Sequence, residues 1–174
     1  MRFPFKRLSL LLLLAPLAAG CSMLSHKPPS AQPAAPSYDL VAAIRAAGVD
    51  DNSIIDVQPL RDPAVAALTD TAHHDEQAGK YAAAATELDQ ALKITPDSPE
   101  LLQYRAEIAV RLKDFPGAEK LAHKSWSLGP RLGPLCARNW QTIVETRLQA
   151  QDKVGAQTAR KWVKQCHKAG VPRY

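Results

Sequence analysis

The sequence predicts an all-α fold, a short solenoid of about three antiparallel helix pairs that follows an extended tether. From Asp62 onward strand signals are nearly absent, and two helix starts of the same kind occur at Asp62-Pro63 and Ser98-Pro99. Each combines a capping side chain with proline at the first helical position, where the missing N–H costs nothing. A shift of 34 residues also aligns two consecutive segments, and such a period is typical of stacked helical hairpins.

The chain begins with the features of a secretory signal peptide. Three basic residues within the first seven precede an apolar run from Leu8 to Ala19. This run is too short to cross a bilayer, which takes about 20 apolar residues. A charged start, a short apolar core and small residues at its end therefore predict a signal peptide over residues 1–20.

The small residues Ala18-Ala19-Gly20 lead directly to Cys21, and this resembles the lipobox of bacterial lipoproteins. The resemblance implies that the Cys21 thiol receives a diacylglycerol and becomes the new N-terminus, an anchor that several acyl chains make stable. The alternative is an ordinary signal peptide followed by a free cysteine, which is unusual in an exported protein. Ser22 follows where an aspartate would favour inner-membrane retention in that family. We therefore expect a lipid-anchored protein on the periplasmic side of a Gram-negative outer membrane.

Two segments separate the cysteine from the repeats. Residues 21–37 hold four prolines and little apolar bulk, which predicts an extended linker. Within residues 38–61, a short helix over 39–47 ends at Gly48, and an extended apolar strip follows over 53–60. Whether that strip fills the concave side of the repeats is left open by the sequence.

The repeat signal covers residues 62–174, divided into pairs at 62–96, 98–130 and 133–170. The aligned pairs are Tyr81 with Phe115, Ala84 with Ala118, Leu88 with Ala122, Ala91 with Ser125, and Pro96 with Pro130. This pattern resembles the tetratricopeptide repeat, in which small residues lie where two helices cross closely. The third pair is less regular, because "DFPGAEK" at 114–120 returns as "DKVGAQT" at 152–158 after 38 residues. Terminal repeats are often irregular because they cap the stack.

The two remaining cysteines are candidates for a disulfide. Cys136 and Cys166 lie 15 residues before and after Gln151, close to the predicted turn of the last pair. Positions equidistant from the turn of an antiparallel pair lie at the same height, and the periplasm favours oxidation. The alternative is two free thiols buried between helices.

No combination of residues predicts catalysis, a cofactor or a metal site. The cluster His73-His74-Asp75-Glu76 lacks the i, i+4 spacing of a zinc site on a helix. Cys166 and His167 are neighbours that face apart on one helix, with no orienting group. Phosphate loops, suitably paired carboxylates and nucleophile elbows are also missing from the sequence. Trp126, Trp140 and Trp162 are interpreted as packing residues rather than as a ligand cage.

The family resemblance implies a peptide groove lined by the first helix of each pair. The positions expected to line this groove are Thr69, His73, Gln77, Gln103, Glu107, Arg111, Gln141 and Glu145. Their polarity suggests hydrogen bonds to a bound protein or peptide. The alternative is that the row is only the solvent face of amphipathic helices.

The charge distribution predicts a second contact surface. Removal of the signal peptide lowers the formal net charge from +5 to +2, and residues 131–174 hold nine Lys/Arg against two Asp/Glu. A basic stripe on the last helix comprises Arg160, Lys161, Lys164 and Lys168. Such a surface suits an acidic protein face, a lipid headgroup or lipopolysaccharide, or it is simply solvated. Nucleic acid is not expected as a partner in this compartment.

These observations together predict a non-catalytic protein-interaction scaffold or assembly factor of the cell envelope. Two alternatives are an anionic lipid or lipopolysaccharide contact module that uses the basic stripe, and an accessory activator of a cell-wall enzyme. The sequence leaves the partner and the oligomeric state open.

Overall fold

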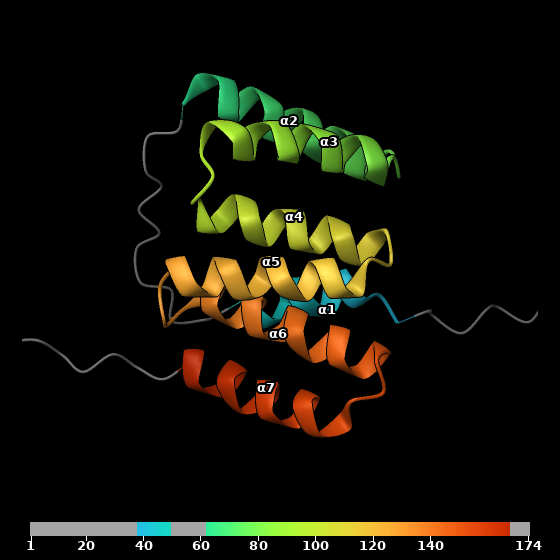
Figure 1. Ribbon diagram of the computed structural model, residues 1–174, viewed down its shortest axis with the longest axis vertical. Helices are drawn as coiled ribbons and strands as arrows, with labels where there is room; N and C mark the ends of the chain where they lie inside the picture. Colours follow the sequence, from blue (N-terminus) through green and yellow to red (C-terminus); the bar gives the residue numbers. More distant parts are fainter. Residues whose placement is uncertain (1–37, 50–61, 168–174) are drawn as a thin grey trace, which may run out of the picture. The chain divides into compact units, whose positions relative to one another are not determined.

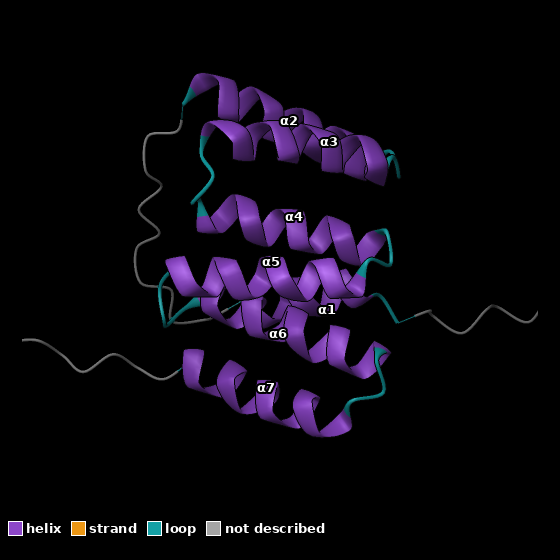
Figure 2. Ribbon diagram, viewed as in Figure 1, coloured by secondary structure: helices purple, strands orange, loops and turns teal. Residues whose placement is uncertain are grey.

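The computed structural model describes residues 38–49 and 62–167 of the 174-residue chain. Over these residues it contains seven α-helices and no strand, which confirms the predicted fold class (Figure 2). The helices are α1 (Leu40–Ala47), α2 (Pro63–Gln77), α3 (Tyr81–Ile94), α4 (Pro99–Arg111), α5 (Phe115–Leu128), α6 (Pro134–Gln149) and α7 (Lys153–Cys166). The predicted signal peptide, Cys21, the linker, the strip at 53–60 and Lys168 lie outside the described residues.

The six helices after residue 61 form three successive hairpins, α2/α3, α4/α5 and α6/α7, stacked along the long axis of the view in Figure 1. Each first helix begins with proline at its first or second position. The Asp62 carboxylate accepts a hydrogen bond from the Ala64 N–H at 2.8 Å, and the Ser98 hydroxyl accepts one from Leu101 at 3.4 Å. These side chains satisfy backbone donors that the helix leaves unpaired at its start.

The second helices α5 and α7 begin with the same local device, which explains the repeated D-x-x-G spacing. Asp114 accepts a hydrogen bond from the Gly117 N–H at 3.0 Å, and Asp152 accepts one from Gly155 at 2.8 Å. A Cβ on either glycine would lie 2.1 Å from the capping carboxylate, so a larger residue would displace the cap. The echo between 114–120 and 152–158 is therefore a requirement of helix capping.

Small residues allow the helices of neighbouring hairpins to approach closely. Ala84, Ala91, Ala118 and Ala122 are fully buried. Ser125, which takes the place of alanine in the second repeat, is also fully buried and donates a hydrogen bond to the Pro99 carbonyl at 2.7 Å. The close packing of such positions explains why the repeat pattern conserves their size between the two segments.

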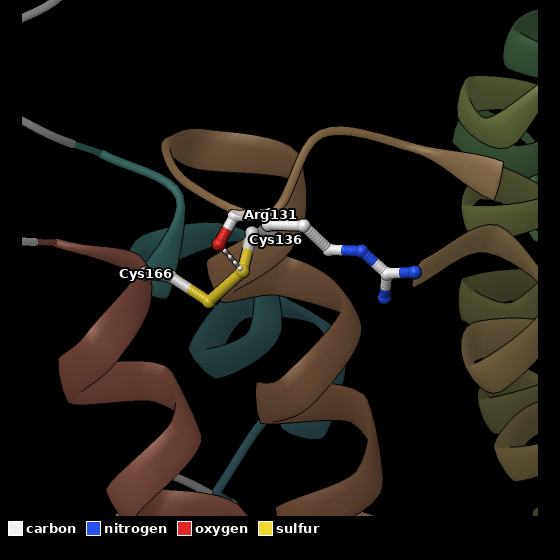
Figure 3. Close-up of a disulfide and its surroundings, with 3 residues drawn as sticks. All are labelled: Arg131, Cys136 and Cys166. Carbon is white, nitrogen blue, oxygen red and sulfur yellow. Dashed lines mark hydrogen bonds between the residues drawn. A yellow bond between two sulfur atoms is a disulfide. The ribbon is translucent and has the colours of Figure 1, made fainter. Parts of the chain in front are cut away.

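A disulfide joins Cys136 near the start of α6 to Cys166 at the end of α7, with an S–S distance of 2.01 Å and a Cα–Cα distance of 5.6 Å (Figure 3). The Cys136 sulfur lies 3.0 Å from the Arg131 carbonyl oxygen, a close contact without a hydrogen because the sulfur is oxidised. The Gly133 N–H also donates to the Cys166 carbonyl at 2.8 Å. Both contacts hold the α5–α6 loop against the end of α7.

Among the described residues, none of the helices combines the length and hydropathy that crossing a membrane would require.

Replacing both cysteines, Cys136→Ser with Cys166→Ser, is expected to lower the free energy of unfolding. The bridged residues are 30 apart in sequence, and closing a loop of that size removes chain entropy from the unfolded state equivalent to about 3 to 4 kcal/mol. Urea unfolding followed by circular dichroism, with and without reductant, measures the loss. Equal stability of the variant and the oxidised protein would show that the bridge does not constrain the unfolded chain.

Candidate interaction surfaces

Helix α1 covers the face formed by the first helices α4 and α6. Its side chains Val41 and Ile44 are buried, with 1% and 0% of their surface exposed. Asp39, before its start, pairs with Arg111 at the end of α4, and Gly48, after its end, lies close to Pro134 and Arg138 at the start of α6. The helix therefore runs antiparallel to α4 and α6, and in Figure 1 it lies behind α6.

This position of α1 corrects the expected groove. Gln103, Glu107 and Glu145 are 0%, 0% and 2% exposed, because α1 and its flanking residues lie over α4 and α6. A partner therefore does not meet these side chains in this conformation. The remaining predicted positions differ: Thr69 is buried, Arg111 and Gln141 are half-buried, and His73 and Gln77 on α2 are exposed.

Glu107 is the centre of a buried polar network. Its carboxylate accepts hydrogen bonds from Arg45 of α1 at 2.8 Å and from Arg138 of α6 at 2.9 Å and 2.5 Å. The Gln103 amide donates to the same carboxylate at 3.0 Å and to the Thr142 hydroxyl at 2.9 Å. A buried carboxylate is tolerated only when it is paired and hydrogen-bonded, and here two guanidinium groups from two other helices meet that need.

Arg45 extends the network to α2. It donates to both carboxylate oxygens of Glu76, at 2.9 Å and 3.0 Å, and the Tyr104 hydroxyl donates to the same carboxylate at 3.0 Å. Burial and the adjacent Glu76 raise the pKa of Tyr104, so this hydroxyl stays protonated as a donor. His73 stacks on the Tyr104 ring at 4.4 Å between centroids. The cluster of histidines and acids on α2 is thus divided between stacking and ion pairing, and the described residues contain no group of three or more potential metal ligands.

The start of α1 is held by two further contacts. The Asp39 carboxylate accepts hydrogen bonds from the Val41 and Ala42 N–H groups at 2.9 Å and 3.0 Å and from Arg111 at 2.9 Å. The Tyr38 hydroxyl donates to Glu145 at 2.8 Å. Burial and the hydrogen bond to Glu145 raise the pKa of Tyr38 to about 12.

On the last hairpin, Arg160, Lys161 and Lys164 of the predicted basic stripe are exposed on α7. None of the three forms an ion pair with a carboxylate among the described residues. They leave an uncompensated positive surface on α7, as the uneven charge distribution predicts.

The three tryptophans meet in one cluster, one each from α5, α6 and α7. Trp140 and Trp162 stack at 5.2 Å between ring centroids with 11° between planes, and Trp126 packs edge-on against them at 5.1 Å and 6.0 Å. Trp140 is buried, as a packing residue should be, but Trp162 remains 38% exposed. The Arg131 guanidinium lies 3.9 Å above the Trp126 ring. The cluster is therefore partly a surface.

The sequence contained a signal for this cluster. Trp140 follows Cys136 by one helical turn, and Trp162 precedes Cys166 by one turn. In an antiparallel pair, a disulfide between the cysteines brings the two indoles to the same height. The contact of Arg131 with Trp126 had no comparable signal, because it depends on the path of the α5–α6 loop.

Comparison with known proteins agrees with this architecture. A profile of the tetratricopeptide repeat matches residues 76–127. Among solved structures, the globular C-terminal domain of P. aeruginosa LpoP is 30% identical in sequence, with a TM-score of 0.57, and the match covers 60% of this chain and 99% of that domain. The chain belongs to the tetratricopeptide-repeat family. A sequence search of curated proteins found no match.

The matched range within the tetratricopeptide-repeat domain runs from the end of α2 through α3 and α4 to the end of α5. This is the part in which the 34-residue period is regular. The third hairpin, with its shifted period, disulfide and tryptophan cluster, follows the matched range. The features that distinguish this chain from a generic repeat are thus concentrated in α6, α7 and α1.

Arg45→Ala is expected to lower the free energy of unfolding by about 2 to 3 kcal/mol, because it removes one of two cations from a fully buried carboxylate. Arg160→Ala is the matched control, since it removes an exposed arginine and should change stability by less than about 0.5 kcal/mol. Chemical unfolding of the three proteins measures the difference. Similar stability of both variants would show that α1 is not held by the Glu107 network.

Asp39→Asn is expected to reduce stability near neutral pH and to matter less in acid. Partial burial opposes the shift, but the Ala42 N–H and Arg111 together hold the pKa of Asp39 below its ordinary value. The ionised group therefore stabilises the fold above its unfolded pKa, and this contribution is lost as pH falls through the folded pKa. Unfolding of both proteins at about pH 7 and about pH 3 checks this. A difference that does not shrink in acid would contradict the assignment.

Proposed function

We propose that the chain is a lipid-anchored protein of the Gram-negative outer membrane whose tetratricopeptide-repeat domain binds a partner protein without catalysis. The observation that carries the proposal is the helical-repeat domain itself, which matches almost the whole globular C-terminal domain of LpoP in sequence and fold. Stacked helical hairpins provide extended, rigid surfaces suited to binding other proteins.

The expected anchor gives the binding its location. The lipobox-like residues before Cys21 and the proline-rich residues 21–37 together make a lipid anchor with a linker. At about 3 Å per residue in polyproline geometry, the linker spans a few tens of Å. Tethering confines the domain to a thin layer above the membrane and raises its effective concentration toward partners in that layer.

A cell-wall enzyme is the partner class that we place first. The proposed compartment is where cell-wall polymers are assembled, and an accessory protein needs only a binding surface and no reactive groups of its own. This form of the proposal requires that the enzyme works faster in the presence of the domain. Binding without a change in rate supports the more general scaffold or assembly role.

The second candidate function is contact with anionic lipid or lipopolysaccharide, favoured by the exposed and unpaired Arg160, Lys161 and Lys164. It predicts binding to vesicles rich in phosphatidylglycerol that weakens steeply with salt. Replacing the three residues by glutamine should abolish that binding. The protein-binding proposal predicts instead that this triple variant still binds its partner protein, although association slows.

Photocrosslinking in intact cells tests protein binding. A photoreactive residue replaces, one at a time, the exposed residues His73 on α2, Leu132 in the α5–α6 loop, Val154 on α7 and Lys164 on α7. At least one position is expected to give a discrete protein adduct, and Cys21→Ser should reduce its yield because the chain loses its anchor. Adducts with lipid alone, or none at any position in a normally exported chain, would contradict the proposal.

A further inference from the structure

We infer that Trp126, Arg131, Leu132 and Trp162, here named the Arg131–tryptophan surface, dock an acidic segment of a partner protein. The inference rests on the proposed function, since it names the surface and the chemistry of the partner that the domain binds. It also moves the binding surface away from the α4–α6 face, which α1 already covers.

Arg131 is a positioned cation without a counter-ion. Its guanidinium lies 3.9 Å above the Trp126 ring and donates to the Ser127 carbonyl at 3.2 Å. It forms no ion pair with a carboxylate within the described ranges, although most other arginines there do. Stacking fixes the plane of the guanidinium while most of its five N–H donors stay available. A fixed plane reduces the entropy lost when a carboxylate binds through two parallel hydrogen bonds.

Trp162 supplies an apolar contact area beside this cation. Its ring stacks on the buried Trp140, so it cannot easily rotate, and yet 38% of the residue remains exposed. Leu132, directly after Arg131, is 45% exposed. Large rigid aromatic rings and arginine are the side chains most enriched among residues that dominate binding energy at protein interfaces. The surface therefore offers an anchor for an apolar side chain and one for a carboxylate.

The disulfide holds these parts in register. It joins Cys136 of α6 to Cys166, one turn after Trp162, and the Gly133 N–H bonds the Cys166 carbonyl. Figure 3 shows the Arg131 carbonyl directed at the disulfide while its side chain extends away from it. The loop that carries Arg131 is thus fixed to the helix that carries Trp162. A surface organised before binding loses less conformational freedom on binding.

Charge favours an acidic protein over a lipid surface as the occupant. The exposed Arg160, Lys161 and Lys164 on α7 give this end of the domain a positive field, which attracts an acidic partner and speeds its association. A membrane surface needs only diffuse positive charge. A single guanidinium fixed on an indole, next to a second exposed indole, is instead suited to one carboxylate and one apolar group on a folded or extended chain.

The test is photocrosslinking from Leu132 in the full-length, anchored protein, combined with variants of Arg131. The matched control position is Val154, which is 76% exposed on α7. We expect a discrete protein adduct from Leu132 but not from Val154. Mass spectrometry should place the crosslink in a partner segment with net negative charge. Arg131→Glu should lower the adduct yield about tenfold, the effect of losing one strong interface contact.

Two variants keep the test decisive. Arg131→Gln removes the charge with little change in size, so it replaces Arg131→Glu if circular dichroism shows that the latter does not fold. Arg131→Lys keeps the charge without the flat, bidentate donor set, and its yield should fall between those of wild type and Arg131→Gln.

Other outcomes separate this inference from the proposed function. Protein adducts from His73, Val154 or Lys164 with none from Leu132 would overturn the Arg131–tryptophan surface and leave protein binding intact. A Leu132 adduct that is lipid or lipopolysaccharide, or one that is insensitive to Arg131→Glu and Arg131→Gln, would also overturn it. The absence of protein adducts at every position would overturn both.

Discussion

The buried carboxylate of Glu107 is the constraint on which one side of this domain depends. A fully buried carboxylate without a cation would cost several kcal/mol. The two cations come from different helices, Arg45 of α1 and Arg138 of α6, and Arg45 also binds Glu76 of α2. One group on α4 thereby determines where α1 lies and links it to two hairpins. The short helix before the repeats is an integral part of the fold for this reason.

This arrangement changes where a partner can bind. In a repeat domain the first helices often carry the binding face, but here α1 covers that face over α4 and α6. The exposed features are His73 and Gln77 on α2, the basic residues of α7, and the tryptophan cluster with Arg131. The last of these combines rigidity, apolar area and an unpaired cation. The disulfide stabilises the third hairpin and also orders that surface, so one covalent bond serves both stability and binding.

Local chemistry explains what the sequence could predict. The proline and cap at Asp62-Pro63 and Ser98-Pro99, and the 34-residue alignment of small residues, depend on nearby residues and on one repeated packing geometry. The heights of Cys136 and Cys166 in a hairpin follow from counting residues about a turn. These features predict the helix pairs, and they place the two cysteines side by side as the structure has them.

The position of α1 could not be predicted in the same way. Glu107 and Arg45 are 62 residues apart, and an undescribed segment separates α1 from α2. A row of polar side chains on a helix has the same periodicity whether it faces water, a bound peptide or buried arginines. The polarity of Gln103, Glu107 and Glu145 therefore suggested an exposed groove, although their partners were in the same chain. The loop path that brings Arg131 onto Trp126 is likewise a tertiary feature.

Amide hydrogen exchange of α1 in the full chain tests the central claim most directly, because it measures whether this helix leaves the α4–α6 face on its own. The Glu107 network predicts that the amides of Leu40–Ala47 are protected to a degree similar to those of α4 and α6, so that they exchange only when the whole domain opens. Protection of α1 that is orders of magnitude lower, with α4 and α6 still protected, would contradict the account. It would mean that α1 detaches independently and that the face beneath it becomes available to a partner.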